Sequence, residues 1–210
     1  MGRIKEHGRR ACSRSSRPVY VIVCEGKNQT EYNYFSHFNT RNGDIIVKPI
    51  KCEATDPISM VERAKISIEA EALSIGEGDK AICLIDVDND SPKKKIVNKL
   101  KDENKDITIL CSNPCFEVWY LFHLLDNPPR LASGQAAKKE VKKYIKNYQE
   151  NYDVLLREPQ IRQNTNEAII RSRKKKLVQD QNEEWIAKGD FPNPYTEVDT
   201  LVEELLKNLK

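Results

Sequence analysis

The chain contains no long apolar run and no sign of a secretory leader. A helix that spans a bilayer needs roughly 20 consecutive apolar residues, and no segment of this sequence approaches that length. The first residues are basic and polar, without the apolar core of a signal peptide. We therefore expect a cytoplasmic protein that has no membrane partner.

Metal-binding patterns of cysteine and histidine are also missing. Cys111 and Cys115 form one close pair, and there is no second pair to complete a zinc site. Cys24 and Cys83 lie in apolar runs, where a thiol behaves as a small hydrophobe, so we expect free thiols. His123 has no second histidine at ligand spacing and is more typical of a core residue than of a catalytic base.

The motifs of nucleotide hydrolysis and of serine nucleophiles are missing as well. There is no Gly-rich loop ending in Gly-Lys-Ser or Gly-Lys-Thr, no Gly-x-Gly-x-x-Gly, and no Ser-His-Asp order. We therefore expect that this chain does not hydrolyse ATP by itself.

What is present is a charged chain of globular size. Of its 210 residues, 32% are charged and 39% are hydrophobic, and the net charge is +3. Such a chain is long enough to bury a core without disulfides. The first 17 residues are strongly basic, because they carry six Lys and Arg residues against a single acid, Glu6. An arm of this kind is usually flexible and most often contacts phosphates.

From residue 18 onward, apolar runs alternate with segments of helical spacing. The strand-like runs lie at 19–24, 44–52, 81–85 and 107–111, and each is followed by a helical pattern. This alternation predicts an α/β fold of the Rossmann-like class, with a largely parallel four-stranded sheet flanked by helices on both faces.

The composition changes after Pro128-Pro129. Helical patterns at about 138–152, 167–179 and 198–206 predict a C-terminal helical extension packed on the same domain. Tyrosines recur every four residues in the first of these, which favours a packing stripe over a stacking face for bases. We divide the chain into a basic flexible arm, an α/β domain and the extension, with bounds at 1–17, 18–127 and 128–210.

Acidic residues follow two of the predicted strands where these end. Glu25 comes directly after the run at 19–24, and Asp86 and Asp88 come after the run at 81–85. Right-handed crossovers bring the carboxyl ends of parallel strands to one edge, where ligands of open α/β sheets bind. Clustered carboxylates repel each other unless a cation neutralises them. The pattern therefore predicts a site for Mg²⁺, with Mn²⁺ as an alternative.

Each of these signals also has a simpler interpretation. On an extended segment Asp86 and Asp88 point to the same side and reach one ion together. Asp and Asn also favour turns, so Asp88–Asp90 equally fits an acidic turn. Glu25 is alternatively the first solvated residue after its strand. Gly26, which follows, would let a backbone approach a phosphate closely.

These residues belong to longer motifs that resemble known proteins. Residues 21–32 together with Asp86-Val-Asp88 look like the Toprim fold shared by topoisomerases, primases and related nucleases. More closely, the chain resembles the RloB family, the AbiLii-like proteins of bacterial anti-phage systems. The matching motifs are Glu25-Gly-x-Asn-x-Thr-Glu31-x-x-Tyr34-Phe35, the loop at 86–88, Ser112-Asn113-Pro114-Cys115-Phe116-Glu117-x-Trp119 and Asn193-Pro194-x-Thr196-Glu197-Val198.

The resemblance implies a Toprim-like domain that binds Mg²⁺ and cuts or rejoins nucleic acid. Glu25 then matches the glutamate assigned to acid–base work or metal contact, and Asp86 and Asp88 match the metal-binding pair. Glu31 and Glu117 lie in the family's motifs, and we expect them as further metal ligands.

One position departs from the pattern of related nucleases. These often carry an extra acid four residues after the first glutamate, where this chain has Gln29. Glu31 would have to replace that acid, so the choice between one and two metal ions is left open.

Basic and polar residues near these motifs are candidates for contacting nucleic acid. Lys27 is the candidate catalytic cation, and an ordinary solvated lysine is the alternative. The basic run at 171–176 favours a surface that contacts phosphates, although a solvated helix face is the commoner use of such a run. The expected substrate-binding residues are Gly26, Asn28, Asn113, Arg171, Arg173 and Lys174.

Together these observations favour a Mg²⁺-dependent, Toprim-like endonuclease that acts in abortive infection. The resemblance implies a partner ATPase that restrains it. The alternatives are a non-catalytic subunit that binds nucleic acid and a module whose C-terminal helices dock the ATPase. The sequence leaves open whether the substrate is RNA or DNA, whether the chain forms a homo-oligomer, and what activates it.

Overall fold

The computed structural model describes residues 17–26, 29–180 and 192–209. Nearly all of the predicted basic arm, and the candidate site residues Lys27 and Asn28, lie outside the described residues. Arg17, the last residue of the arm, is described, and its guanidinium donates a hydrogen bond of 2.8 Å to the carbonyl oxygen of Gly43.

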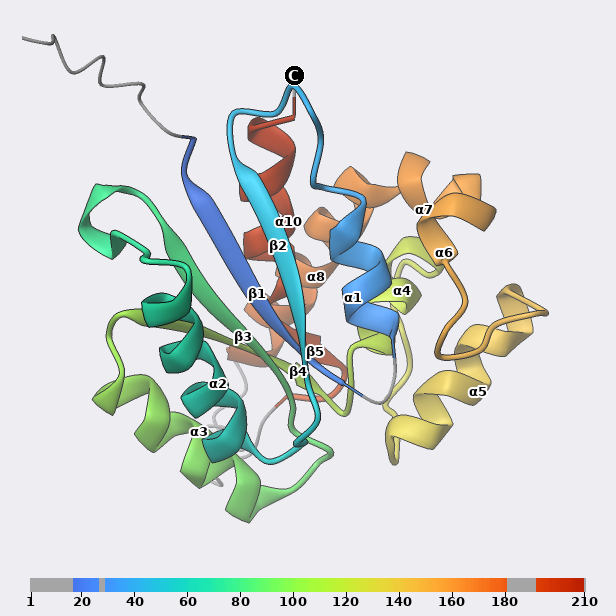
Figure 1. Ribbon diagram of the computed structural model, residues 1–210. Helices are drawn as coiled ribbons and strands as arrows, with labels where there is room; N and C mark the ends of the chain where they lie inside the picture. Colours follow the sequence, from blue (N-terminus) through green and yellow to red (C-terminus); the bar gives the residue numbers. More distant parts are fainter. Residues whose placement is uncertain (1–16, 27–28, 181–191, 210) are drawn as a thin grey trace, which may run out of the picture.

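A five-stranded sheet forms the centre of the protein, in the order β2-β1-β3-β4-β5 (Figure 1). The first four strands pair in parallel, which confirms the predicted α/β class. The fifth pairs antiparallel with the end of β4 and was not predicted, because two residues show no alternation. The strands are β1 (Val19–Glu25), β2 (Ile46–Cys52), β3 (Lys80–Asp86), β4 (Ile107–Asn113) and β5 (Tyr195–Thr196).

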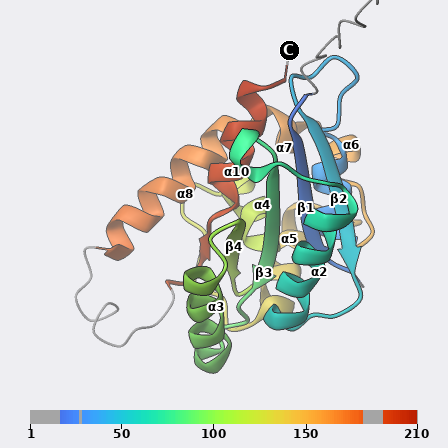
Figure 2. The same cartoon turned by 60° about the vertical axis from the view of Figure 1, so that its left-hand side comes forward.

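Helices cover both faces of the sheet (Figures 1 and 2). On one face lie α2 (Pro57–Ala70) and α3 (Ser91–Glu103). The other face is covered by α1 (Thr30–Ser36), α4 (Glu117–Leu124), α5 (Gly134–Tyr144), α8 (Thr165–Asp180) and α10 (Val198–Lys207). Alternation along β1 supplies both cores, because Ile22 and Cys24 pack on the α1 side while Val23 packs on the α2 side.

Aspartate side chains cap the starts of both helices on the α2–α3 face of the sheet. The Oδ1 atom of Asp56 accepts a hydrogen bond of 2.9 Å from the Ser59 amide at the start of α2. The Oδ1 atom of Asp90 accepts one of 3.1 Å from the Lys93 amide at the start of α3. Such caps satisfy amides that have no partner within the helix. Asp90 therefore ends the acidic loop after β3 and fixes where α3 begins.

The C-terminal region contributes to the same core as the sheet. Buried residues of α5, α8 and α10 belong to one cluster with residues of β1 and α4. Two short helices, α6 (Val154–Arg157) and α7 (Pro159–Gln163), precede α8. The predicted boundary between residues 127 and 128 stays a prediction. No helix in the described part of the chain has the length and apolar character to cross a bilayer.

The predicted helix at 138–152 is wrong in its second half. The helix α5 ends at Tyr144, and the chain turns back before α6. The predicted tyrosine stripe is therefore broken: Tyr144 is 45% exposed, while Tyr148 is buried. The turn brings Tyr148 back toward the carboxyl edge of the sheet, where it contacts a residue of the candidate site.

Candidate metal centre

Four acidic side chains converge at the carboxyl edge of the sheet. Glu25 ends β1 and Asp86 ends β3, and these two strands are neighbours in the sheet. From β1 the chain passes outward to β2 and then returns to β3, so the ends of β1 and β3 flank the point where the strand order reverses. Glu31, in the first turn of α1, and Glu117, the first residue of α4, complete the group.

The distances define two overlapping sets of ligand atoms. Carboxylate oxygens of Glu25, Glu31 and Asp86 lie within 4.8 Å of one another. The Sγ atom of Cys115 and oxygens of Asp86 and Glu117 form a second set within the same limit. Asp86 belongs to both sets. We refer to Glu25, Glu31, Asp86 and Glu117 as the carboxylate cluster.

Burial makes negative charge costly in this cluster. Glu31 is 4% exposed and Glu117 is 2% exposed. Burial raises the pKa of Glu31 well above its usual range, and the charge of Glu117 raises it further. The pKa of Asp86 is raised in the same way, by burial first and then by the charge of Glu31. Burial also raises the pKa of Glu25. Without a cation, burial therefore favours the protonated forms of these groups.

The chain supplies little compensation for these charges. Tyr148 donates a hydrogen bond of 2.8 Å from its hydroxyl to the Oε1 atom of Glu117. The ammonium of Lys138 lies 4.0 Å from the same oxygen. The Oε2 atom of Glu31 is buried and has no hydrogen-bond partner among the described residues. A buried, unpartnered carboxylate oxygen is costly unless the group is protonated or a cation binds it.

The donor atoms fit a hard divalent cation. Glu25, Glu31 and Asp86 offer oxygen atoms alone, which Mg²⁺ prefers. The second set is less suitable, because burial raises the pKa of the Cys115 thiol well above its usual range and keeps it protonated. Its Sγ atom donates a weak hydrogen bond of 3.8 Å to the carbonyl oxygen of Gly134. The three oxygen donors are therefore the better site for a metal ion.

Asp88 lies outside both sets of ligand atoms. The expectation that Asp86 and Asp88 share an extended segment is wrong, because β3 ends at Asp86 and Asp88 has a φ of +59°. The side chain of Asp88 is 53% exposed and forms an ion pair of 2.8 Å with Lys93. The simpler interpretation of an acidic turn therefore describes its position. Its role as a metal ligand stays a prediction.

The Asn-Pro motifs hold this turn in place. The Oδ1 atom of Asn113 accepts a hydrogen bond of 2.8 Å from the amide of Asn89, which also has a φ of +59°. The side-chain Nδ2 atom of Asn193 donates a hydrogen bond of 2.6 Å to the Oδ1 atom of Asn89. Asn113 is 1% exposed. The predicted substrate contact of Asn113 is untested, and the contacts of its side chain serve the turn.

Gly26 has a packing role that the sequence did not reveal. A Cβ atom at this position would lie 2.1 Å from the carbonyl oxygen of Cys52, a distance at which the atoms overlap. Glycine therefore allows the chain leaving β1 to pass against the end of β2. The predicted approach of Gly26 to a phosphate is untested.

Arg171 contacts the C-terminal end of α4, which lies away from the carboxylate cluster. Its guanidinium donates hydrogen bonds of 3.1 and 3.2 Å to the carbonyl oxygens of Phe122 and His123. It also forms an ion pair of 2.6 Å with Asp126. At about 1.5 Å per residue, His123 lies about 9 Å along the helix from Glu117. The structure does not bring Arg171 to the cluster.

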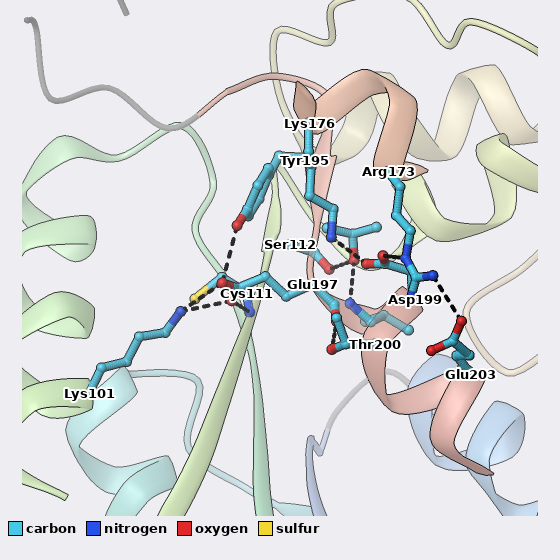
Figure 3. A network of polar contacts seen from close by, with 12 residues as sticks. Lys101, Cys111, Ser112, Arg173, Lys176, Tyr195, Glu197, Asp199, Thr200 and Glu203 are labelled. Atoms are coloured by element: carbon cyan, nitrogen blue, oxygen red, sulfur yellow. Dashed lines mark hydrogen bonds and ion pairs between the residues drawn. The ribbon is translucent and has the colours of Figure 1, made fainter. Parts of the chain in front are cut away.

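The rest of the basic run lies against α10. Arg173 forms ion pairs with Glu203 at 2.8 Å and with the buried Asp199 at 3.6 Å. Lys176 forms one of 2.6 Å with Asp199 (Figure 3). Lys174 is exposed. Arg173 and Lys176 therefore hold α8 on α10, and Lys174 alone of the expected substrate contacts in this run points to solvent without a described partner.

Two residues beside the cluster were not predicted as site residues. Lys138 and Tyr148 contact Glu117 from the segment that follows Pro129. No spacing in the sequence links that segment to Glu117, because an irregular turn returns the chain to the sheet edge. His123, by contrast, is a core residue as expected. It is buried, and burial lowers its pKa to about 4, so its ring stays neutral.

Comparison with known proteins adds one finding. A family model described as RloB-like protein matches residues 20–205 of the chain. No curated protein and no solved structure matches the chain.

Proposed function

The chain belongs to the RloB-like family, and we propose that it is a Mg²⁺-dependent nuclease that cleaves phosphodiester bonds in RNA or DNA during anti-phage defence. The observation that supports this proposal is the carboxylate cluster. It places three oxygen donors within 4.8 Å of one another where ligands of such sheets bind. A purely structural role for these buried acids is the weaker explanation, because buried acids that stabilise a fold are paired with cations.

Each residue of the cluster has a role in this proposal. Glu25, Glu31 and Asp86 hold the metal ion. A bound Mg²⁺ supplies the positive charge that polarises the phosphoryl oxygen and stabilises charge in the transition state. The Tyr148 hydroxyl orients Glu117, and the carboxylate of Glu117 would orient a water molecule beside the metal ion. Lys138 offers a cation beside Glu117.

The proposal favours a single metal ion. The acid expected at position 29 is absent, and Glu31 brings a carboxylate into the oxygen site from α1 instead. A second ion between Asp86 and Glu117 would have the protonated thiol of Cys115 as its third neighbour, and a thiol is a poor ligand for Mg²⁺. The partner ATPase and its restraining role are kept as expectations from the family resemblance.

The experiment compares two aspartates of the same loop. Mg²⁺ and Mn²⁺ are titrated calorimetrically into the wild type, Asp86→Asn and Asp88→Asn. We expect Asp86→Asn to abolish measurable binding, and Asp88→Asn, the matched control, to bind within about threefold of the wild type, because Asp88 lies outside the oxygen site. Cleavage of labelled transfer RNA, single-stranded RNA and DNA is followed in parallel.

The outcomes separate the proposal from its rivals. Metal binding and cleavage that are both lost in Asp86→Asn would support the nuclease. Equal titrations for all three proteins would mean that Asp86 holds no metal. A non-catalytic subunit that binds nucleic acid would then be the better description. Loss of binding in both variants would restore Asp88 to the ligand set.

A further inference from the structure

A polar cavity opens beside the carboxylate cluster. Its volume is about 500 Å³, within the roughly 300–1,000 Å³ of typical ligand cavities. It lies between α5 and the turn that brings Tyr148 back to the sheet edge. The lining residues are Gln29, Lys138, Lys142, Tyr148, Gln149, Glu150 and Asn151.

The cavity shares its walls with the carboxylate cluster. Tyr148 lines the cavity, and its hydroxyl donates a hydrogen bond to the carboxylate of Glu117. Thr30, the neighbour of Glu31 on α1, donates a hydrogen bond of 2.9 Å to the carbonyl oxygen of Glu150. A ligand in the cavity therefore lies next to Glu117 and the start of α1.

The two lysines of the cavity differ in their partners. Lys138 is paired with the carboxylates of Glu117 and Glu150. Lys142 is exposed and has no ion-pair partner among the described residues. A lysine without a partner, at the mouth of a cavity, offers a compact positive charge to an incoming anion. Lys142 is therefore the group most suited to receive a phosphate.

The remaining lining favours a nucleotide over a simple anion. Gln29, Gln149 and Asn151 carry side-chain amides, each of which donates and accepts hydrogen bonds. The edge of a nucleobase presents the same mixture of donors and acceptors. Inorganic phosphate would use Lys142 and leave these amides without a role.

We propose that this cavity binds one nucleotide of a single-stranded nucleic acid, with a phosphate on Lys142 and the base edge on the amides. The inference rests on the proposed function and names the form of its substrate. In a duplex the edge of the base is occupied by its pairing partner, so the cavity takes an unpaired strand. The neighbouring phosphodiester then lies at the carboxylate cluster.

The test compares two lysines of the same helix. Lys142→Gln removes the charge at the cavity, and Lys139→Gln removes the same charge from an exposed lysine of α5 that does not line it. Both lysines are exposed, so both variants should fold. Binding of fluorescein-labelled decamers of uridylate and thymidylate is measured by anisotropy in EDTA, so that neither metal nor cleavage contributes.

We expect Lys142→Gln to weaken binding about tenfold, the effect of losing one charged hydrogen bond. The slope of log affinity against log salt should fall by about 0.7, the value for one phosphate on a single strand. Lys139→Gln should stay within about twofold of the wild type. Equal effects of the two substitutions would overturn the proposal, and so would no binding by the wild type.

Competition experiments identify the molecule that supplies the phosphate. A duplex of the same sequence and uridine monophosphate are tested as competitors, and both should compete at least about tenfold more weakly than the decamer. Equal competition by either one would overturn the single-strand assignment. Mg²⁺ titration of Lys142→Gln should match the wild type. If the strand binds through Lys142 while the wild type binds no metal, the nuclease fails and the nucleotide site stands.

Discussion

The carboxylate cluster and the ion-pair network around Asp199 both bury acidic side chains, and they differ in the cations beside them. In the network, Lys176 and Arg173 contact Asp199, and Arg173 also binds Glu203 (Figure 3). Asp199 is fully buried. In the cluster, four acids have two ammonium groups nearby, and each of these is shared with another acid. Lys138 is also paired with Glu150, and Lys93, which acts on Glu25, is paired with Asp88.

This difference separates acids that are paired within the fold from acids that could bind a cation. A buried carboxylate needs a compensating charge, and the chain provides it for Asp199 from α8. Glu31 forms no ion pair among the described residues, and the charge of Lys138 only partly offsets the rise in its pKa. One of its carboxylate oxygens has no hydrogen-bond partner there. Sites that bind ligands often carry such a cost to stability. The chain therefore buries acids in two different settings, one with close ion pairs and one with little compensation.

The largest expected effect concerns the paired acid. Asp199→Asn should destabilise the protein by about 3 kcal/mol, because it removes a buried charge and leaves Lys176 without its partner. The free energy of unfolding is measured by urea denaturation. The control is Asp106→Asn, at an exposed position, which should change it by less than about 0.5 kcal/mol. Equal values for both variants would contradict the distinction between the two regions.

A comparable gain is expected when a metal supplies the missing charge. Mg²⁺ at 100 times its dissociation constant should stabilise the wild type by about 2.7 kcal/mol, because it binds the folded state alone. Thermal unfolding with and without Mg²⁺ measures this gain. Asp86→Asn should show no comparable gain, whereas Asp199→Asn should show the full one. A gain of equal size in Asp86→Asn would indicate binding elsewhere on the surface.

A smaller effect of opposite sign is expected for the unpaired acid. Without metal at neutral pH, Glu31→Gln should stabilise the protein by about 1–2 kcal/mol, because it removes a charge that burial disfavours. The folded-state pKa of Glu31 is raised, so its favourable contribution is complete below its ordinary pKa of about 4.3 and is lost as the pH rises through the raised value.

The advantage of Glu31→Gln over the wild type should therefore shrink as the pH falls below that raised pKa. Urea denaturation at several pH values in EDTA measures this dependence. Asp199→Asn provides the comparison, since it should remain destabilised at neutral pH. A Glu31→Gln protein that is less stable than the wild type at neutral pH would show that Glu31 has a partner, and the two regions would then not differ.

The strand ends were the predictable part of the site. Buried runs that stop at acids place Glu25 and Asp86 at one sheet edge from the pattern alone. Glu31 and Glu117 were expected only through the family resemblance, because first-turn acids on helices are common. Lys138 and Tyr148 were beyond prediction, since the turn after Tyr144 follows no periodicity. The basic run at 171–176 was visible, but a list of lysines and arginines does not show which acids of α10 meet them.

The smallest effect concerns the Tyr148 hydroxyl, which donates a hydrogen bond to Glu117. Tyr148→Phe should destabilise the protein by about 1 kcal/mol, because it removes a buried hydrogen bond to Glu117. The control is Tyr152→Phe, which removes a hydrogen bond of the same length, 2.8 Å, from the half-buried Glu158. Water can replace that partner, so its loss should cost less than about 0.5 kcal/mol.

Metal affinity extends the comparison of these two tyrosines to function. If the Tyr148 hydroxyl orients Glu117 beside a bound ion, Tyr148→Phe should weaken Mg²⁺ binding by about threefold to tenfold, whereas Tyr152→Phe should leave it unchanged. Calorimetric titration measures both. A loss of stability in Tyr148→Phe with full metal affinity would mean that Glu117 needs the hydroxyl for folding alone. The metal would then be held by Glu25, Glu31 and Asp86, the three residues that offer oxygen atoms within 4.8 Å of one another.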